Sequence, residues 1–280
     1  MSKPSKKVFE KYFREERFPS IFCKGCGAGN IMHFSGQALY EAGIEPRELV
    51  VFSGIGCCGR IPGYFKVDAA HTTHGRALAF ATGAKIANPE LNILVFSGDG
   101  DTGAIGGNHL IQACRRNIDL TLIIINNRIY GMTGGQAAPT TPQGAKSTTS
   151  PYGNIEPPLD LSSLASSAGG TYVAKWSTAH PRECIKSIRK GLENEGFSCI
   201  EILSPCPTGY GKRNKELLKD TYEIFENLPV LSRASPMSKD EYEKEKQKNE
   251  YGWVLGILED KEEPEFSKKV EDLSKQIAKS

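Results

Sequence analysis

The sequence predicts an α/β fold built on a doubly wound, mostly parallel sheet. Nearly continuous apolar runs such as 92–97 and 120–125 are typical of strands that are buried on both faces. These runs end in loops rich in glycine or asparagine, and segments with helical periodicity alternate with them. Strand, helix and strand in this order form a βαβ unit with a right-handed crossover.

The individual elements follow in chain order. The first strand is expected at 49–53 and ends at Gly54. A helix rich in Ala and Leu is expected at 74–87 and stops before Asn88-Pro89, because helices tend to end near proline. The further expected elements are a strand at 92–97, a loop at 98–107, a helix at 108–116 and strands at 120–125 and 198–203.

Two segments depart from this alternation. Residues 131–160 are rich in Gly, Pro, Thr and Ser, and so long a loop is usually functional or disordered. From about Met237 the chain becomes rich in Lys and Glu, which predicts a solvated, partly helical tail that packs on a neighbour through 251–258. We expect a main domain at 1–225 and a charged C-terminal extension at 226–280 that packs on the domain or on a partner.

Composition narrows the functional classes. The chain has 280 residues and a formal net charge of +2, and no basic block suggests nucleic-acid binding or a membrane anchor. Neither an N-terminal signal peptide nor an apolar stretch long enough to span a membrane is found. These observations predict a cytoplasmic enzyme that binds neither nucleic acid nor membrane.

Polar residues follow two neighbouring strands. Gly98-Asp99-Gly100-Asp101 ends one strand and Asn126-Asn127 ends the next, so both lie at the carboxyl edge where open α/β sheets bind ligands. Glycines let backbone N–H groups approach a phosphate. An aspartate would repel a phosphate unless a cation lay between them, as Mg²⁺ does with its oxygen ligands.

The eight cysteines divide by context. Cys23 and Cys26 form a Cys-x-x-Cys pair, which fits zinc, a redox disulfide or an iron–sulfur cluster. The loop cysteines that can complete such a site are Cys57, Cys58 and Cys206. The other three, Cys114, Cys184 and Cys199, lie in helix or strand patterns and are expected to be small buried apolar residues.

Residues 54–59 also match the G-x-G-x-x-G pattern of dinucleotide-binding proteins. The pattern requires a helix that begins inside the motif, whereas Arg60-Ile61-Pro62-Gly63 breaks any helix almost at once. No acidic residue ends a second strand at the expected distance. We therefore do not expect NAD binding.

Several segments together resemble the β subunit of 2-oxoacid:ferredoxin oxidoreductases, and most closely the 2-oxoglutarate-using type. The Gly-Asp-Gly loop followed by Asn-Asn resembles the diphosphate-binding motif of thiamine-diphosphate enzymes. The resemblance covers roughly residues 18–210. The segments that carry it are Phe22-Cys23-Lys24-Gly25-Cys26-Gly27, Ser53-Gly54-Ile55-Gly56-Cys57, His71-Thr72-Thr73-His74-Gly75-Arg76, Gly98-Asp99-Gly100-Asp101, Gly106-Gly107-Asn108-His109, 126–136 and Ser204-Pro205-Cys206-Pro207.

The resemblance implies a thiamine-diphosphate-binding fold and a set of site residues. Mg²⁺ would be bound by the side chains of Asp99 and Asn127 and the carbonyl of Ile129. A [4Fe–4S] cluster would be held by Cys23, Cys26, Cys57 and Cys206, with Cys58 as the alternative third ligand. Contacts with thiamine diphosphate would come from Ile55, Gly56, Cys57, Cys58, His74, Gly98, Gly100, Asp101, Gly131 and Met132.

The resemblance also implies a reaction and partners. The expected reaction is oxidative decarboxylation of 2-oxoglutarate with coenzyme A to succinyl-CoA, CO₂ and reduced ferredoxin. Arg60 would bind the second carboxylate of the substrate, and together with His74 it is the expected catalytic residue. The glutamate that activates the cofactor would come from an α subunit, in paired αβ units, so this chain alone is expected to be inactive.

Three alternatives remain open from the sequence. The same chemistry on pyruvate or a branched-chain 2-oxo acid would leave Arg60 without its expected role. A non-catalytic assembly subunit stapled by zinc would be colourless and would lack thiamine diphosphate. A non-oxidative thiamine enzyme such as a carboligase would leave the cysteines without a function.

Overall fold

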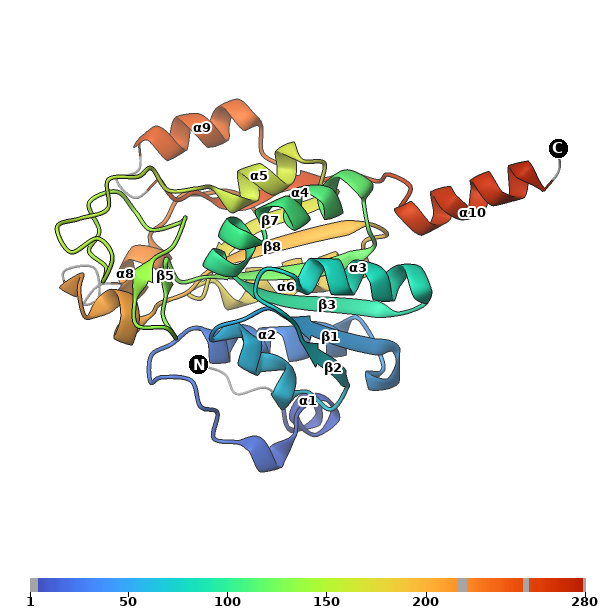
Figure 1. The fold of residues 1–280 in the computed structure, drawn as a ribbon, viewed down its shortest axis with the longest axis horizontal. Coiled ribbons are helices and arrows are strands. Elements are labelled where there is room, and N and C mark those ends of the chain that lie inside the picture. Colours follow the sequence, from blue (N-terminus) through green and yellow to red (C-terminus); the bar gives the residue numbers. More distant parts are fainter. Residues whose placement is uncertain (1–4, 216–220, 249–251, 279–280) are drawn as a thin grey trace.

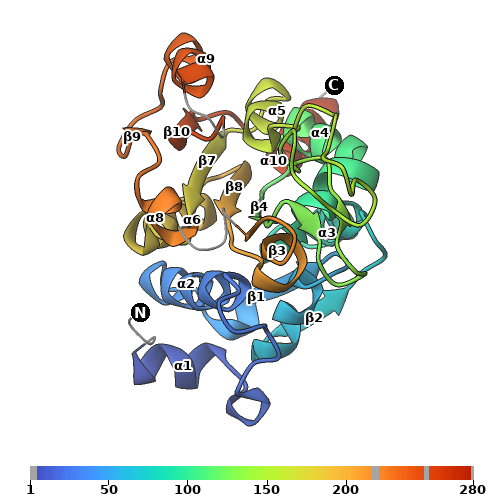
Figure 2. The same cartoon turned by 90° about the vertical axis from the view of Figure 1, so that its left-hand side faces the viewer.

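The structure, a computed structural model, describes residues 5–215, 221–248 and 252–278. In this part of the chain, eight strands form one sheet in the order β2-β1-β3-β4-β8-β7-β10-β9 (Figures 1 and 2). All neighbouring pairs are parallel except β7 and β10. The strands are β1 (Leu49–Ser53), β2 (Asp68–His71), β3 (Asn92–Gly98), β4 (Leu120–Asn126), β7 (Tyr172–Ser177), β8 (Phe197–Leu203), β9 (Val230–Ser232) and β10 (Leu255–Asp260).

Helices cover both faces of the sheet, as Figure 2 shows. Helices α2 (Ala28–Glu41) and α6 (Pro181–Glu193) lie on one face, and their residues Met32 and Ile188 belong to one core cluster. Helices α3 (Ala77–Ala87), α4 (Gly107–Arg116) and α5 (Leu161–Ser167) lie on the other, where Leu110 packs in a second cluster. The sheet is therefore buried on both sides, which is why β4 reads as an unbroken apolar run.

Short elements connect and flank these layers. They are α1 (Lys6–Tyr12), η1 (Glu15–Arg17), η2 (Pro46–Glu48), η3 (Cys58–Tyr64), η4 (Asp101–Ile105), β5 (Ile129–Tyr130), β6 (Gln136–Ala137), η5 (Pro207–Gly211), α8 (Thr221–Glu226), α9 (Lys239–Lys248) and α10 (Phe266–Ile277). Among the helices described, none is long and apolar enough to cross a membrane.

The sequence predictions of the fold are confirmed, with differences at the ends of elements. Helix α3 begins at Ala77 rather than at His74, because Gly75 forms a turn before it. The φ of Gly75 is +69°, a left-handed backbone conformation that residues with a side chain rarely adopt. The expected loop at 98–107 contains the one-turn π-helix η4. The three cysteines expected to be buried, Cys114, Cys184 and Cys199, each have 0 % exposure.

The C-terminal region packs more extensively on the main domain than its charged composition indicates. Strand β10 pairs with β7 and β9, and Leu255 in it is fully buried. Much of the predicted extension therefore packs on the domain itself, and Tyr251 lies outside the described residues. Helix α10 instead projects from the body (Figure 1) and buries no residue.

The sheet order brings four loops together. Strands β1, β3, β4 and β8 are consecutive neighbours and all parallel, so their carboxyl ends meet at one edge. The loops that leave this edge begin at Gly54, Asp99, Asn127 and Ser204. These loops contain most of the residues to which the sequence assigned a function.

Candidate functional site

A cavity of about 180 Å³ lies at the carboxyl edge of β3 and β4. Every residue that the sequence assigned to the diphosphate cofactor or its magnesium ion lines this cavity. They are Ile55, Gly56, Cys57, Cys58, His74, Gly98, Asp99, Gly100, Asp101, Asn127, Ile129, Gly131 and Met132. The structure thus brings together side chains from four separate loops.

Asp99 is the buried anion of this cavity. Its side chain is 2 % exposed and accepts a hydrogen bond from the hydroxyl of Thr140. Desolvation raises the pKa of Asp99 to about 6, against the lowering effect of hydrogen bonds from Thr140 and the Asn127 backbone. A divalent cation would offset this desolvation, and carboxylate, amide and carbonyl oxygens are the ligands Mg²⁺ prefers. The donor set of Asp99, Asn127 and Ile129 therefore fits the predicted metal.

Asp101 has a different task. Its Oδ1 accepts hydrogen bonds from the backbone N–H groups of Gly75 (2.8 Å) and Ile55 (3.2 Å), and lies 2.5 Å from Nδ1 of His74. Its Oδ2 accepts from the Ser97 hydroxyl at 2.5 Å. With four donors on one carboxylate, Asp101 fixes the β1 loop and the imidazole of His74. The Nε2 atom of His74 remains as the nitrogen available to a ligand.

Glycines allow the loops to pack this closely. A Cβ atom at Gly54 would lie 1.6 Å from Oδ2 of Asp101, and one at Gly100 would lie 2.4 Å from the Tyr130 ring. Gly56 has φ +110° and nothing within 4 Å of its Cβ position. Its backbone is thus exposed toward open space in the cavity wall, as the approach of a phosphate or a ring requires.

Two of the predicted cluster ligands face the same small volume. The sulfurs of Cys206 and Cys57 lie 3.4 and 3.9 Å from the position that a Cβ atom on Gly131 would occupy. The backbone N–H of Gly209 donates to Cys206 Sγ at 3.4 Å, which orients this side chain. The Cys58 thiol points elsewhere and lies 3.7 Å from the carbonyl oxygen of Ile55. A Cβ atom added at Gly98 would lie 3.7 Å from the Cys58 sulfur.

The Cys-x-x-Cys loop docks beside them. Gly27 N donates to the Pro205 carbonyl at 3.3 Å, and Cys23 Sγ lies 3.6 Å from the Thr208 hydroxyl. The charges of Cys23, Cys57 and Cys206 act on Cys26, and burial raises the pKa of the Cys26 thiol to about 11. The eight cysteines form no disulfide.

The spacing of these sulfurs bears on what they hold. Around a single zinc ion, with Zn–S about 2.3 Å, tetrahedral thiolates lie only about 3.8 Å apart. Among the described residues, no three His, Cys, Asp or Glu side chains converge closely enough to hold a single metal ion. The sulfurs of Cys57 and Cys206 thus face one volume, but the described residues form no ready-made site for a single metal ion.

Arg60 does not lie in this cavity. It is exposed and lines a neighbouring cleft on the other side of η3, together with His71. Its charge still acts on Cys57, lowering that pKa against the larger effect of burial. Its predicted contact with substrate stays a prediction.

Some residues of the site were not found from the sequence. Tyr130 donates from its hydroxyl to the Gly100 carbonyl at 3.0 Å and lines the cavity. Thr140 reaches Asp99 from the loop at 131–160, and Ser97 precedes the glycine–aspartate loop. The unusual length of that loop was the available signal, but nothing in its composition indicates which threonine points inward.

The comparisons with known proteins bear on this geometry. Residues 54–202 match the family model "Thiamine pyrophosphate enzyme, C-terminal TPP binding domain". The chain is 50 % identical over 274 residues to the 2-oxoglutarate synthase subunit KorB of Methanocaldococcus jannaschii, covering 96 % of this chain and 97 % of that one. It is 42 % identical over 222 residues to the 2-oxoacid:ferredoxin oxidoreductase subunit beta of Saccharolobus solfataricus, covering 77 % and 73 %.

The chain belongs to the β subunits of the 2-oxoacid:ferredoxin oxidoreductases. A solved structure agrees with this assignment. The 2-oxoglutarate:ferredoxin oxidoreductase from Magnetococcus marinus, with 2-oxoglutarate, coenzyme A and succinyl-CoA bound, matches with a TM-score of 0.83 and 30 % identity, covering 96 % of this chain and 90 % of that one. The matched family model spans the loops after β1, β3 and β4, so the cavity lies within the thiamine-diphosphate-binding part of this oxidoreductase subunit.

Proposed function

We propose that this chain is the thiamine-diphosphate-binding β subunit of an enzyme that converts 2-oxoglutarate and coenzyme A to succinyl-CoA and CO₂ and reduces a ferredoxin. The observation that carries the proposal is the convergence of the cavity residues and two cysteine sulfurs at one sheet edge. The high identity to 2-oxoglutarate synthase subunits over nearly the whole chain supports 2-oxoglutarate as the substrate.

The proposed cofactors follow from the donor groups. Asp99, Asn127 and the Ile129 carbonyl would hold Mg²⁺ on the diphosphate, and Cys23, Cys26, Cys57 and Cys206 would hold a [4Fe–4S] cluster beside it. When bound, thiamine diphosphate supplies the nucleophilic carbon and the electron sink, and the cluster accepts electrons singly.

The residues of this chain supply position and charge. The carboxylate of Asp101 accepts a hydrogen bond from Nδ1–H of His74, which leaves Nε2 free to accept a hydrogen bond within the cavity. The Gly56 loop exposes backbone toward the cavity, and Cys57 in the same loop would hold the electron acceptor beside the cofactor. A cluster held there would take up electrons one at a time, so no hydride acceptor would be needed.

The cavity forms only one part of a complete ligand site. Its volume of about 180 Å³ is below the roughly 300–1,000 Å³ of complete ligand pockets. Apolar side chains stay exposed around it, with Ile55 38 %, Met132 46 % and Ile105 49 % accessible. Exposed apolar groups at the mouth of a cavity mark a surface that a partner covers. We propose that an α subunit closes the site.

A substrate assay tests the proposal. The α–β complex, purified without oxygen, is expected to reduce ferredoxin when given coenzyme A and 2-oxoglutarate, and to do so much more slowly with pyruvate or a branched-chain 2-oxo acid. Faster reduction with pyruvate would assign the alternative substrate. A colourless complex that contains zinc and no thiamine diphosphate would contradict the proposal altogether.

A further inference from the structure

A buried arginine lies between two of the predicted magnesium ligands. Arg128 stands between Asn127 and Ile129, just after the end of β4, and is only 2 % exposed. Both neighbours line the cofactor cavity, whereas Arg128 does not. Its guanidinium group instead lies over the ring of Tyr210 in η5. The side chain therefore points away from the cavity and toward the segment that follows β8.

Three aromatic rings enclose this guanidinium group. Its central carbon lies 4.5 Å from the ring centre of Tyr210, 4.7 Å from that of Trp253 and 5.3 Å from that of Phe225, and all three residues are buried. Within residues 5–215, 221–248 and 252–278, no Asp or Glu side chain forms an ion pair with Arg128. Its Nε atom has no hydrogen-bond partner there either. Ring faces attract a cation but do not neutralise its charge.

The backbone at this position also disfavours arginine. Arg128 has φ +63°, a left-handed conformation that glycine and asparagine adopt more readily than a long side chain does. The side-chain oxygen of Asn126 accepts a hydrogen bond from the Arg128 backbone N–H at 3.2 Å, which fixes the turn. A residue that is kept against both burial and backbone preference indicates a compensating role. For a buried cation, that role is an interaction with negative charge.

One predicted cluster ligand belongs to the same packing unit. Tyr210 and Cys206 lie in one buried cluster of side chains. The residues on either side of Tyr210 both bind Cys206: Gly209 N–H donates to its Sγ at 3.4 Å, and Gly211 N–H donates to its carbonyl at 2.9 Å. The ring beneath the guanidinium group is thus fixed to the segment that carries the cysteine. The charge of Arg128 acts on Cys206 as well as on Asp99.

We propose that the buried charge of Arg128 stabilises the reduced form of the cluster held at Cys206 and so raises its reduction potential. This inference rests on the proposed function, which assigns a four-iron cluster to these cysteines. Uptake of one electron adds a negative charge to a cluster that four thiolates already surround, and net charge and burial help to set such potentials. A cation in the protein interior is screened far less than one at the surface. Arg128 itself gains or loses neither electron nor proton.

The test compares Arg128→Gln and Arg128→Lys with the wild type in the anaerobically purified α–β complex. A redox titration followed by electron paramagnetic resonance measures the cluster whose signal is absent from Cys206→Ser. In Arg128→Gln, the ratio of reduced to oxidised cluster at a fixed potential is expected to fall about tenfold, which is about 59 mV for one electron. Arg128→Lys keeps the charge, so its ratio should stay within about twofold of the wild type.

Arg47→Gln is the matched control and should leave the ratio unchanged. Arg47 is exposed, contacts Glu48, and precedes the amino end of β1, at the sheet edge opposite the cavity. It removes the same charge at a distant surface position.

An unchanged ratio in Arg128→Gln with the cluster intact would overturn the inference, and so would weaker thiamine diphosphate binding at an unchanged ratio, which would assign the charge to Asp99 and the diphosphate. Loss of iron from both Arg128 variants would overturn it in favour of a packing role. Loss of iron from Arg128→Gln alone would support it, because only the charge differs in kind. A wild-type complex without iron would refute the proposed function itself, whatever the variants show.

Discussion

At the scale of single residues, the two aspartates of the Gly-Asp-Gly-Asp loop are separated by environment. Asp99 is buried at the cavity and accepts from the Thr140 hydroxyl and from backbone N–H groups of its own loop and of Asn127. The carboxylate of Asp101 instead receives donors from other loops, at Ile55, Gly75, His74 and Ser97. The sequence placed both at the diphosphate. We propose that Asp99 binds the cation and that Asp101 holds the surrounding loops in position.

This separation predicts different effects of two similar substitutions. Asp99→Asn should weaken Mg²⁺-dependent binding of thiamine diphosphate, because it removes the charge that faces the cation. Asp101→Asn should leave cation binding closer to normal but lower kcat by roughly 10–100-fold, because His74 loses its orientation. Cofactor titration and steady-state kinetics on the complex measure both.

Asp240→Asn, on the exposed side of α9, is the control for these two and should change neither property. Equal loss of cofactor affinity in Asp99→Asn and Asp101→Asn would show that the two carboxylates share one role.

Substitutions can also distinguish the roles of the adjacent Cys57 and Cys58. The Cys57 sulfur faces that of Cys206 across Gly131, whereas the buried Cys58 contacts the Ile55 carbonyl. Cys57→Ser is therefore expected to lose bound iron and visible absorbance, and Cys58→Ser to keep both. Iron analysis of the two anaerobically purified variants decides between them. Retention of iron in Cys57→Ser together with its loss in Cys58→Ser would reverse the assignment.

At the scale of elements, a buried charge network joins α5, α9 and the centre of the sheet. Lys175 Nζ lies 3.3 Å from Asp160 Oδ1 and 3.4 Å from Glu201 Oε2, and all three side chains are almost completely inaccessible. Tyr242 on α9 donates to Asp160 at 2.7 Å, and the Asn126 amide donates to Glu201 at 2.6 Å. The network therefore connects the C-terminal region to the strand end that carries Asn127.

Removing the cation of this network should be costly. Lys175→Met would leave the buried Glu201 without a cation and Asp160 with Lys246 alone, a change worth about 3–5 kcal/mol in the free energy of unfolding. Lys186→Met on the exposed face of α6 should change that free energy by less than about 0.5 kcal/mol. Denaturant unfolding measures both, and equal stability of the two variants would show that the network contributes little.

This network also marks the limit of sequence reasoning. The loops after β1, β3, β4 and β8 could be predicted because each follows an apolar run and carries glycine, aspartate, asparagine or cysteine. The pairing of Lys175 with Asp160 depends on strand order and on where α9 docks, which no local pattern encodes. For the same reason, the sequence predicted that 251–258 packs on a neighbour but not that strand β10 lies beside β7.

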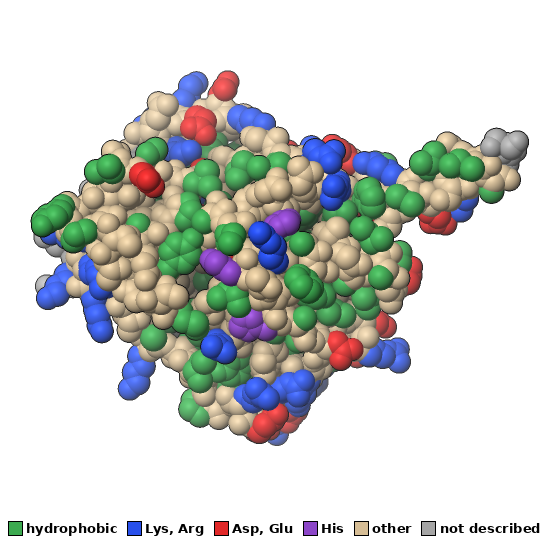
Figure 3. Space-filling model, viewed as in Figure 1, with side chains coloured by type: hydrophobic (Ala, Val, Ile, Leu, Met, Phe, Trp, Pro, Cys, Tyr) green, Lys and Arg blue, Asp and Glu red, His purple; other side chains and the backbone are tan. Residues whose placement is uncertain are grey.

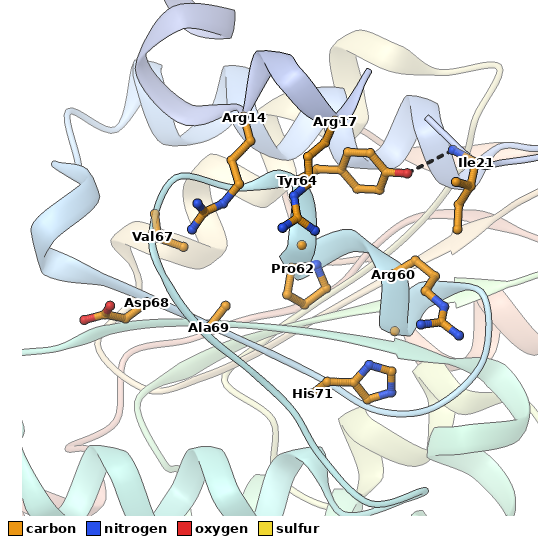
Figure 4. Close-up of a pocket in the computed structure, with 12 residues that line it drawn as sticks. Arg14, Arg17, Ile21, Arg60, Pro62, Tyr64, Val67, Asp68, Ala69 and His71 are labelled. Atoms are coloured by element: carbon orange, nitrogen blue, oxygen red, sulfur yellow. Dashed lines mark hydrogen bonds between the residues drawn. The ribbon is translucent and has the colours of Figure 1, made fainter. Parts of the chain in front are cut away.

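Arg60 shows the same limit within the site. The resemblance assigned it to the substrate carboxylate, and the structure places it on η3, where it lines the neighbouring cleft (Figure 4). Which ligand it contacts depends on the bound substrate, so its role stays a prediction.

At the scale of the whole molecule, the site faces outward and is incomplete. The cavity is small, its rim is apolar, and Figure 3 shows histidine and hydrophobic side chains gathered on the face of the molecule near the ends of the strands. We expect the isolated chain to bind thiamine diphosphate weakly and to show no turnover with 2-oxoglutarate and coenzyme A. Addition of the α subunit should restore both. Turnover by the isolated chain would refute a shared site.

We propose that one cation-bridged diphosphate and one four-iron cluster lie side by side on this sheet edge. The most direct measurement is the thiamine diphosphate, magnesium and iron content of the anaerobically purified complex, compared between the wild type and Cys206→Ser. We predict one thiamine diphosphate and one magnesium per β chain in both proteins, with about four iron atoms per β chain lost in the variant. An unchanged iron content in Cys206→Ser, or a wild-type complex without thiamine diphosphate, would contradict the account.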